Sequence, residues 1–223
     1  MVASGFGARF GIWDYRVAFS ILRWSTYAAL AIVAFALLGL LVPRIRSRAW
    51  LALVVALVVA GMAAAFPLVW MQRARSLPPV NDITTDPEHP PAFVAILPLR
   101  KDATVPAAYA GPEAAELQRR GYPDIAPIHV DDDPRTAFAA ALAIATRLGW
   151  EVVAAESTAG VIEATATTPW FGFHDDVVVR IAPEGPGSRI DIRSVSRVGR
   201  GDFGTNARRV REFASAFTAP EAR

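Results

Sequence analysis

The fold is decided by residues 160–206, GVIEATATTPWFGFHDDVVVRIAPEGPGSRIDIRSVSRVGRGDFGTN. Runs rich in β-branched residues at 161–166, 175–181 and 188–198 each predict a β-strand. The residues PEGPG at 183–187 are a turn signal between the last two runs. A further strand is expected just upstream, at 150–155. Short strands joined by tight turns predict a four-stranded antiparallel meander.

One face of such a sheet needs an apolar cover, and the flanking sequence supplies helices for it. Asp133 and Pro134 are an N-cap and a first helical residue, and they open a helix that ends at Gly149. A shorter helix begins at Pro112. The C-terminal helix, for which Thr205 or Asn206 is the expected cap, carries apolar residues at helical spacing: Val210, Phe213, Ala214 and Phe217. We therefore expect an α+β fold, with an antiparallel four-stranded sheet flanked by helices on one face.

The first third of the chain has a different character. No charged residue occurs between Arg23 and Arg44, or between Arg48 and Arg73, and each interval is long enough to cross a bilayer as a helix. The sequence therefore predicts a two-helix transmembrane hairpin before the domain. The expected organisation is an interfacial segment at 1–23, membrane helices at about 24–43 and 50–71, a Pro-rich tether at 73–110, a soluble domain at 111–217 and a tail at 218–223.

The tether has two interpretations. Its paired prolines and turn-forming residues are typical of a spacer that lifts a domain off the bilayer. Alternatively, residues 81–86 pack into the domain as a fixed arm.

The arginines around the membrane helices predict an orientation. Three of them lie in the short connector at 43–48, and the positive-inside rule places such a connector in the cytoplasm. The domain would then face the periplasm from the inner membrane. A membrane protein of this kind contacts lipid, and the basic residues beside the helices would meet anionic headgroups.

Composition excludes several functions. The chain has no cysteine, so disulfides, thiolate catalysis and Cys-ligated metal sites are excluded. Residues 78–223 contain fifteen Lys and Arg against twenty Asp and Glu, although the whole chain is slightly basic. Phosphate backbones need a positive field, so nucleic acid is not an expected partner.

Several long motifs occur in an order that resembles a known family. PPVNDITTDPEHPPAF, GWEVV, IEATATTPWFGFHDDVVVRI and DIRSVSRVGRGDFGTNARRVREF together resemble the family catalogued as domain of unknown function 1499, over roughly residues 78–217. The resemblance implies a membrane-anchored or secreted bacterial protein with plastid relatives. It implies no activity, because none is established for the family.

The cluster His174-Asp175-Asp176 is the first candidate for chemistry. Successive side chains of a strand point to opposite faces, so the three cannot converge on their own. A metal-assisted hydrolase would need Asp202 or another partner beside them. The simpler interpretation is that the carboxylates of Asp175, Asp176 and Asp202 form structural ion pairs; the expected partners of the first two are Arg193, Arg197 and Arg200.

Two further features predict a binding surface. Residues 199–204, GRGDFG, precede a helix and form either a tight turn or an anion site. The aromatic residues Trp170 and Phe171 form either a core plug or an apolar contact with a partner or lipid. The arginines that would complete this surface are Arg193, Arg197, Arg200 and Arg208.

The sequence thus favours a non-catalytic, membrane-tethered envelope module without metal or cofactor. Its expected partners are membrane lipid and either another envelope protein or an anionic lipid. A metal-assisted hydrolase is the alternative.

Overall fold

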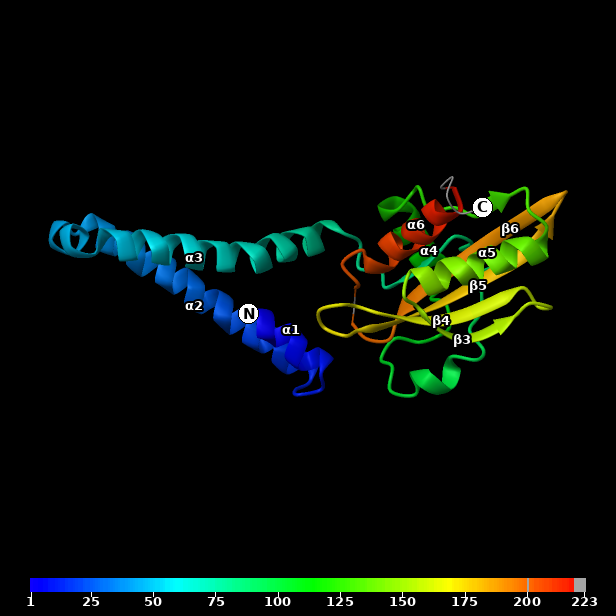
Figure 1. The fold of residues 1–223 in the computed structure, drawn as a ribbon, viewed down its shortest axis with the longest axis horizontal. Coiled ribbons are helices and arrows are strands. Elements are labelled where there is room, and N and C mark those ends of the chain that lie inside the picture. The colour runs from blue at the N-terminus through cyan, green and yellow to red at the C-terminus, as the bar shows by residue number, and fades with distance from the viewer. Residues whose placement is uncertain (200, 219–223) are drawn as a thin grey trace. The chain divides into compact units, whose positions relative to one another are not determined.

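The computed structural model describes residues 1–199 and 201–218, and it divides the chain into two compact units (Figure 1). The first contains Met1–Ser76 together with four residues of a distant loop, Pro169–Gly172. The second contains Leu77–Thr168 and Phe173–Arg223. The tail expected at 218–223 lies outside the described residues beyond its first position.

Three helices form the first unit: α1 (Val2–Arg9), α2 (Tyr15–Leu41) and α3 (Pro43–Ser76). Helices α2 and α3 are long and apolar enough to span a membrane. Both start earlier than expected from the sequence. The carboxylate of Asp14 accepts a hydrogen bond from the Arg16 N–H and caps α2, and nothing after it interrupts the helix.

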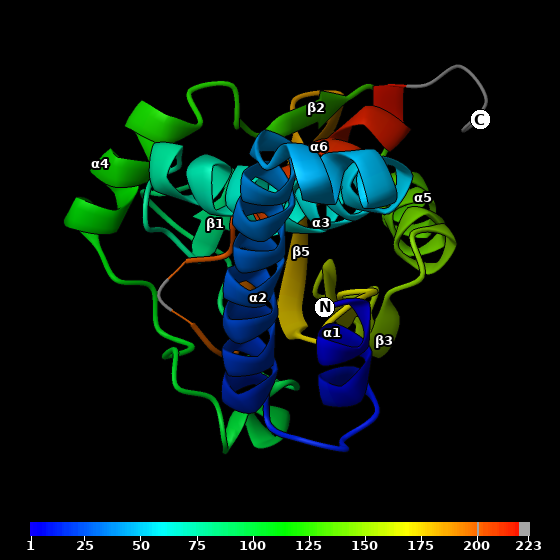
Figure 2. The same cartoon turned by 90° about the vertical axis from the view of Figure 1, so that its left-hand side faces the viewer.

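Small residues bring α2 and α3 together. Ala29 of α2 is buried with Ala60 and Ala64 of α3, and Gly39 leaves room for Leu53, whose Cδ2 would lie 2.9 Å from an added Cβ. Close approach through small residues is how apolar helices associate in membranes. The connector expected at 43–48 is itself helical, and the backbone kinks just after it, at Ala49. Figure 2 shows α1, in dark blue, joined to the start of α2 by a short loop.

Within the described residues, the second unit is built on an antiparallel sheet of six strands, not the four expected. The two additional strands, β1 (Asp82–Thr84) and β2 (Ile128–Val130), both pair with β6 (Gly187–Ser196). Each has only three residues, which is too short to show an alternating pattern. The remaining strands are β3 (Glu151–Glu156), β4 (Val161–Thr167) and β5 (His174–Glu184), in the order β1-β6-β5-β4-β3.

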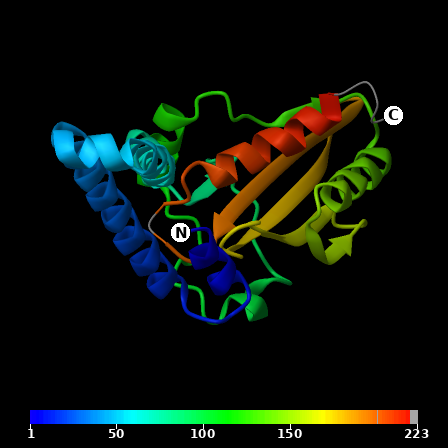
Figure 3. The same cartoon turned by 60° about the vertical axis from the view of Figure 1, so that its left-hand side comes forward.

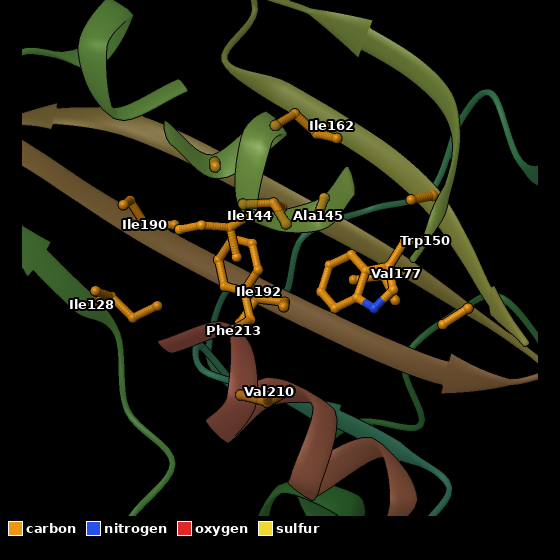
Figure 4. Packing of buried hydrophobic residues seen from close by; sticks show 14 of the residues in the cluster. Ile128, Ile144, Ala145, Trp150, Ile162, Val177, Ile190, Ile192, Val210 and Phe213 are labelled. Carbon is orange, nitrogen blue, oxygen red and sulfur yellow. The ribbon is translucent and has the colours of Figure 1, made fainter. Parts of the chain in front are cut away.

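Helices α5 (Pro134–Arg147) and α6 (Thr205–Thr218) contact these strands (Figure 3), while α4 (Pro112–Gly121) lies beside β1 through Gln118. The Asp133 carboxylate accepts hydrogen bonds from the backbone N–H groups of Arg135 and Thr136, so the predicted N-cap of α5 is confirmed. Under these helices, Phe213 stacks on Trp150 with ring centroids 5.4 Å apart (Figure 4). Ile190 and Ile192 of β6 are buried in the same core.

The second face of the sheet is covered as well, by the segment expected to be a tether. This segment enters the sheet as β1 and continues through a short 3-10 helix, η1 (Leu97–Arg100). Phe93 and Ile96 are buried against Val178 and Val195 of the sheet. The stretch at 81–86 is therefore a fixed arm and not a spacer, and the packed segment extends beyond it to Ala107. Residues 82–107 are called the arm below.

A single carboxylate holds the middle of this arm. Glu163 of β4 is 2% exposed and accepts hydrogen bonds of 2.9 Å from the backbone N–H groups of Val94, Ala95 and Ile96. Three N–H donors to one buried carboxylate compensate its desolvation and fix the local backbone.

We expect Glu163→Gln to release the arm locally. The amide nitrogen of Gln would face N–H donors, and a hydrogen bond to a charged group contributes about 1.5–3 kcal/mol. Hydrogen exchange of the Val94, Ala95 and Ile96 amides should therefore accelerate by roughly tenfold or more. Glu156→Gln, at an exposed strand end, is the matched control and should change nothing. Unchanged protection in Glu163→Gln would contradict the assigned role.

Candidate functional site

The second face of the sheet carries a buried cluster of charges centred on Asp176. This carboxylate is fully buried and binds two guanidinium groups, those of Arg100 on η1 and Arg197 just after β6. Arg197 reaches it through Nε and one terminal nitrogen, the latter 2.8 Å from Oδ1. The hydroxyl of Thr165 donates a further hydrogen bond of 2.9 Å. The two guanidinium groups balance the charge of this carboxylate, and the Thr165 hydroxyl occupies a further acceptor position on it.

A second buried pair lies beside it. Arg193 holds Asp82 of β1 in a bidentate pair, with nitrogen–oxygen distances of 2.9 and 2.7 Å. The guanidinium lies over the rings of Phe93 and Tyr109. Burial raises the pKa of Asp82, and Arg193 opposes this shift. Burial and the nearby charge of Asp82 raise the pKa of Tyr109 to about 12.

A third group of charges lies further along the same face, toward the β5–β6 turn. Asp86 and Asp191 are bridged by Arg180 and Arg189, each of which contacts both carboxylates. Burial alone would raise the pKa of Asp86, but the His89 N–H and the two guanidinium groups outweigh it and hold the pKa below its ordinary value.

The helix-covered face holds a polar cluster of its own. Asp175 pairs with Arg209 of α6 at 2.7 Å. Arg209 also donates to the Ser194 hydroxyl, which in turn donates to the Asn206 side chain at 2.7 Å. The Asn206 amide donates to Ser196 at 2.9 Å. No base accepts the proton of either serine among these contacts, so the cluster fastens α6 to β6 and does not activate a nucleophile.

Asp202 has a capping role. Its carboxylate accepts hydrogen bonds from the backbone N–H groups of Gly204 and Asn206 at the start of α6. The expected caps, Thr205 and Asn206, are therefore replaced by a residue further upstream. Burial raises the pKa of Asp202, the two N–H groups lower it, and the charge of Asp175 adds to the increase. Because Asp202 occupies the helix N-terminus, an external anion would have to displace it.

The three residues of the His-Asp-Asp cluster do not converge. His174 is exposed and contacts Thr167 at 3.1 Å, while Asp175 and Asp176 point to opposite faces. Over the described residues, 1–199 and 201–218, no three His, Cys, Asp or Glu side chains form a group that could hold a metal ion.

The arginines proposed as an anion site lie in different environments. Arg193 is buried and paired on the second face, and Arg197 is mostly covered by its contact with Asp176. Arg208 is 66% exposed on α6, 3.6 Å from Glu212. Arg200 lies outside the described residues.

The aromatic loop clusters with the helical unit. The ring of Phe171 stacks on Phe19 at 4.9 Å, and Trp170 packs edge to face against Phe66 and Trp70. The indole N–H of Trp170 donates to the Val2 carbonyl at 3.0 Å. The side chains of Trp170 and Phe171 therefore make apolar contacts with aromatic residues of α2 and α3.

Sequence reasoning identified some of these residues and missed others. Asp176 pairs with Arg197, one of its three expected partners, but Asp175 pairs with Arg209 instead. The partners that were missed are Arg100, Arg209, Asp82 and Glu163. The alternation of side chains along β6 places Arg193 on the second face of the sheet, so its burial could have been predicted if a cover for that face had been recognised. No pattern near Arg100 in the sequence indicates that its side chain is buried.

Comparison with known proteins agrees with the extent of the second unit. Residues 82–217 match the family described as Protein of unknown function (DUF1499). No curated protein matches the chain.

We expect Asp176→Asn to destabilise the protein by about 3–5 kcal/mol, because it leaves the buried guanidinium of Arg100 without a full counter-charge. Urea unfolding of the full chain in detergent, followed by tryptophan fluorescence, measures this change. The control is Asp124→Asn, which breaks the exposed pair with Arg211 and should cost at most about 1 kcal/mol. Equal effects of the two substitutions would contradict the structural role of Asp176.

Proposed function

We propose, from the geometry described above, a function for this chain, which belongs to the family described as Protein of unknown function (DUF1499). It acts as a membrane-anchored, non-catalytic binding module of the cell envelope, with its domain in the periplasm. Its partners are membrane lipid and either another envelope protein or an anionic lipid.

One observation carries this proposal: aromatic loops leave the sheet at the end where the chain arrives from α3. Thr167 pairs with His174, and Asp175 pairs with Ser196, so these residues lie at one end of the sheet. The loop with Trp170 and Phe171 connects β4 and β5 there. The loop with Phe203 follows β6 at the same end.

The entry of the chain is fixed at that end by hydrogen bonding. The Ser196 N–H donates to the Asn81 carbonyl at 2.9 Å, just before β1. Only five residues separate Ser76, the last residue of α3, from Asp82, the first of β1. Apolar side chains therefore gather at the end of the sheet where the chain enters the second unit, and such side chains suit a membrane-associated partner.

The arrangement of charge supports binding over catalysis. The buried acids of both faces pair with arginines or accept hydrogen bonds from backbone N–H groups, so their charges serve the fold. General acid or base catalysis needs a group that can donate or accept a proton within reach of a substrate. The hydrolase alternative, based on His174, Asp175, Asp176 and Asp202, has no converging geometry to support it.

The orientation can be tested by cysteine labelling, because the chain has no cysteine of its own. We expect Ser157→Cys, in the exposed β3–β4 turn, to react with a membrane-impermeant maleimide in intact spheroplasts. Ser47→Cys, in the arginine-rich connector, should react only after permeabilisation. The reverse pattern would overturn the periplasmic placement.

Binding at the aromatic loop can be tested by photo-crosslinking in cells. A photoreactive phenylalanine analogue at position 170 should form adducts with lipid or with another envelope protein. The same analogue at exposed position 157 is the control and should form far fewer. Adducts only within the chain itself would indicate that the loop is a structural plug and would contradict a binding role.

A further inference from the structure

Helix α1 carries its large apolar side chains on the outside and its small residues on the inside. Val2, Phe6 and Phe10 recur at every fourth position and so form one stripe, and they are 69%, 42% and 71% exposed. The buried positions of the helix are Ser4, Gly5 and Gly7. An amphipathic helix in water has the opposite arrangement, with its apolar stripe toward the core. The arrangement of α1 therefore suits a helix whose outer side meets an apolar medium.

The inner side of α1 receives two indole rings of the same unit. The indole N–H groups of Trp13 and Trp170 donate to backbone carbonyls of α1 at 2.9 and 3.0 Å. A Cβ added at Gly7 would overlap the Trp13 ring, and a Cβ added at Gly5 would overlap the Trp170 ring. Glycine is otherwise unfavourable inside a helix. These ring contacts explain the glycines of α1, but they leave its apolar stripe exposed.

The chain holds α1 beside the first turns of α2. It turns back at Gly11, whose φ is +69°, and only residues 10–14 separate the two helices, which contact each other. Helix α2 has 27 residues and is about 40 Å long, whereas the hydrocarbon core of a bilayer is about 30 Å thick. Its uncharged part begins after Arg23 with Trp24 and Tyr27, and such rings are typical of the membrane interface. The turns before Arg23, and α1 beside them, therefore lie at the level of the headgroups when α2 spans the bilayer.

We infer that α1 is an interfacial membrane helix whose lipid contact is the side that carries Val2, Phe6 and Phe10. This inference rests on the proposed function, because it requires the bilayer that receives α2 and α3. The occupant is lipid and not a second copy of the chain. A stable protein interface buries roughly 800 Å² on each partner, and one side of a helix about 12 Å long and about 10 Å wide is far too small for that. The exposed Arg16 and Arg23 of α2 add attraction to anionic headgroups.

A single-cysteine probe tests the contact in the full chain, which has no cysteine of its own. Phe6→Cys, labelled with an environment-sensitive nitrobenzoxadiazole dye, is reconstituted into vesicles of phosphatidylcholine and phosphatidylglycerol. We expect strong quenching by lipid that carries a spin label on its headgroup. The same dye in Phe10→Cys gives a second, independent position on the stripe. Phe35→Cys is the matched control, because Phe35 is 73% exposed in the uncharged part of α2, and its dye should be quenched by a spin label deep in the acyl chain.

The outcomes separate this inference from the proposed function. If neither lipid quenches the dye at positions 6 and 10 while the acyl-chain label quenches it at position 35, the inference is removed and the membrane anchor stands. If the dye at position 35 is unquenched as well, both the anchor and the inference are contradicted. Energy transfer between donor-labelled and acceptor-labelled copies at position 6, without quenching by lipid, would show that a second copy covers the stripe and would overturn the inference.

Discussion

The fold of the second unit depends on the pairing of buried arginines with carboxylates across β6. Arg193 and Arg197 lie on the face opposite Ile190 and Ile192, because strand residues alternate. A buried charge without a partner costs several kcal/mol, so this face needs both counter-ions and a cover. Asp82 and Asp176 supply the counter-ions, and the arm from β1 to η1 supplies the cover.

This constraint explains why a Pro-rich segment becomes part of the domain. The apolar contribution of the arm to this face is small and centres on Phe93 and Ile96. Its position is set by polar contacts instead: Asp82 with Arg193, Arg100 with Asp176, and the backbone of Val94, Ala95 and Ile96 with Glu163. Such contacts contribute directional specificity more than net stability. The arm thus holds the start of the second unit firmly against the centre of the sheet.

The same geometry separates structural from functional features. Residues that looked chemical in isolation, such as Asp175, Asp176 and Asp202, each have a partner within the fold. The loop of Trp170 and Phe171 instead contacts aromatic rings of α2 and α3.

The amino-acid sequence by itself determined the two long apolar helices, the four long strands, and the helices α4, α5 and α6, because each has a local signal. Apolar length, alternation of side chains, Asp133 before Pro134 and helical spacing from Val210 to Phe217 depend only on neighbouring residues. Tertiary structure alone decided the two three-residue strands, the burial of the arm and the partners of each charge. A guanidinium such as that of Arg100 is the same group in solvent and in the core, and only contacts between residues far apart in the chain distinguish the two.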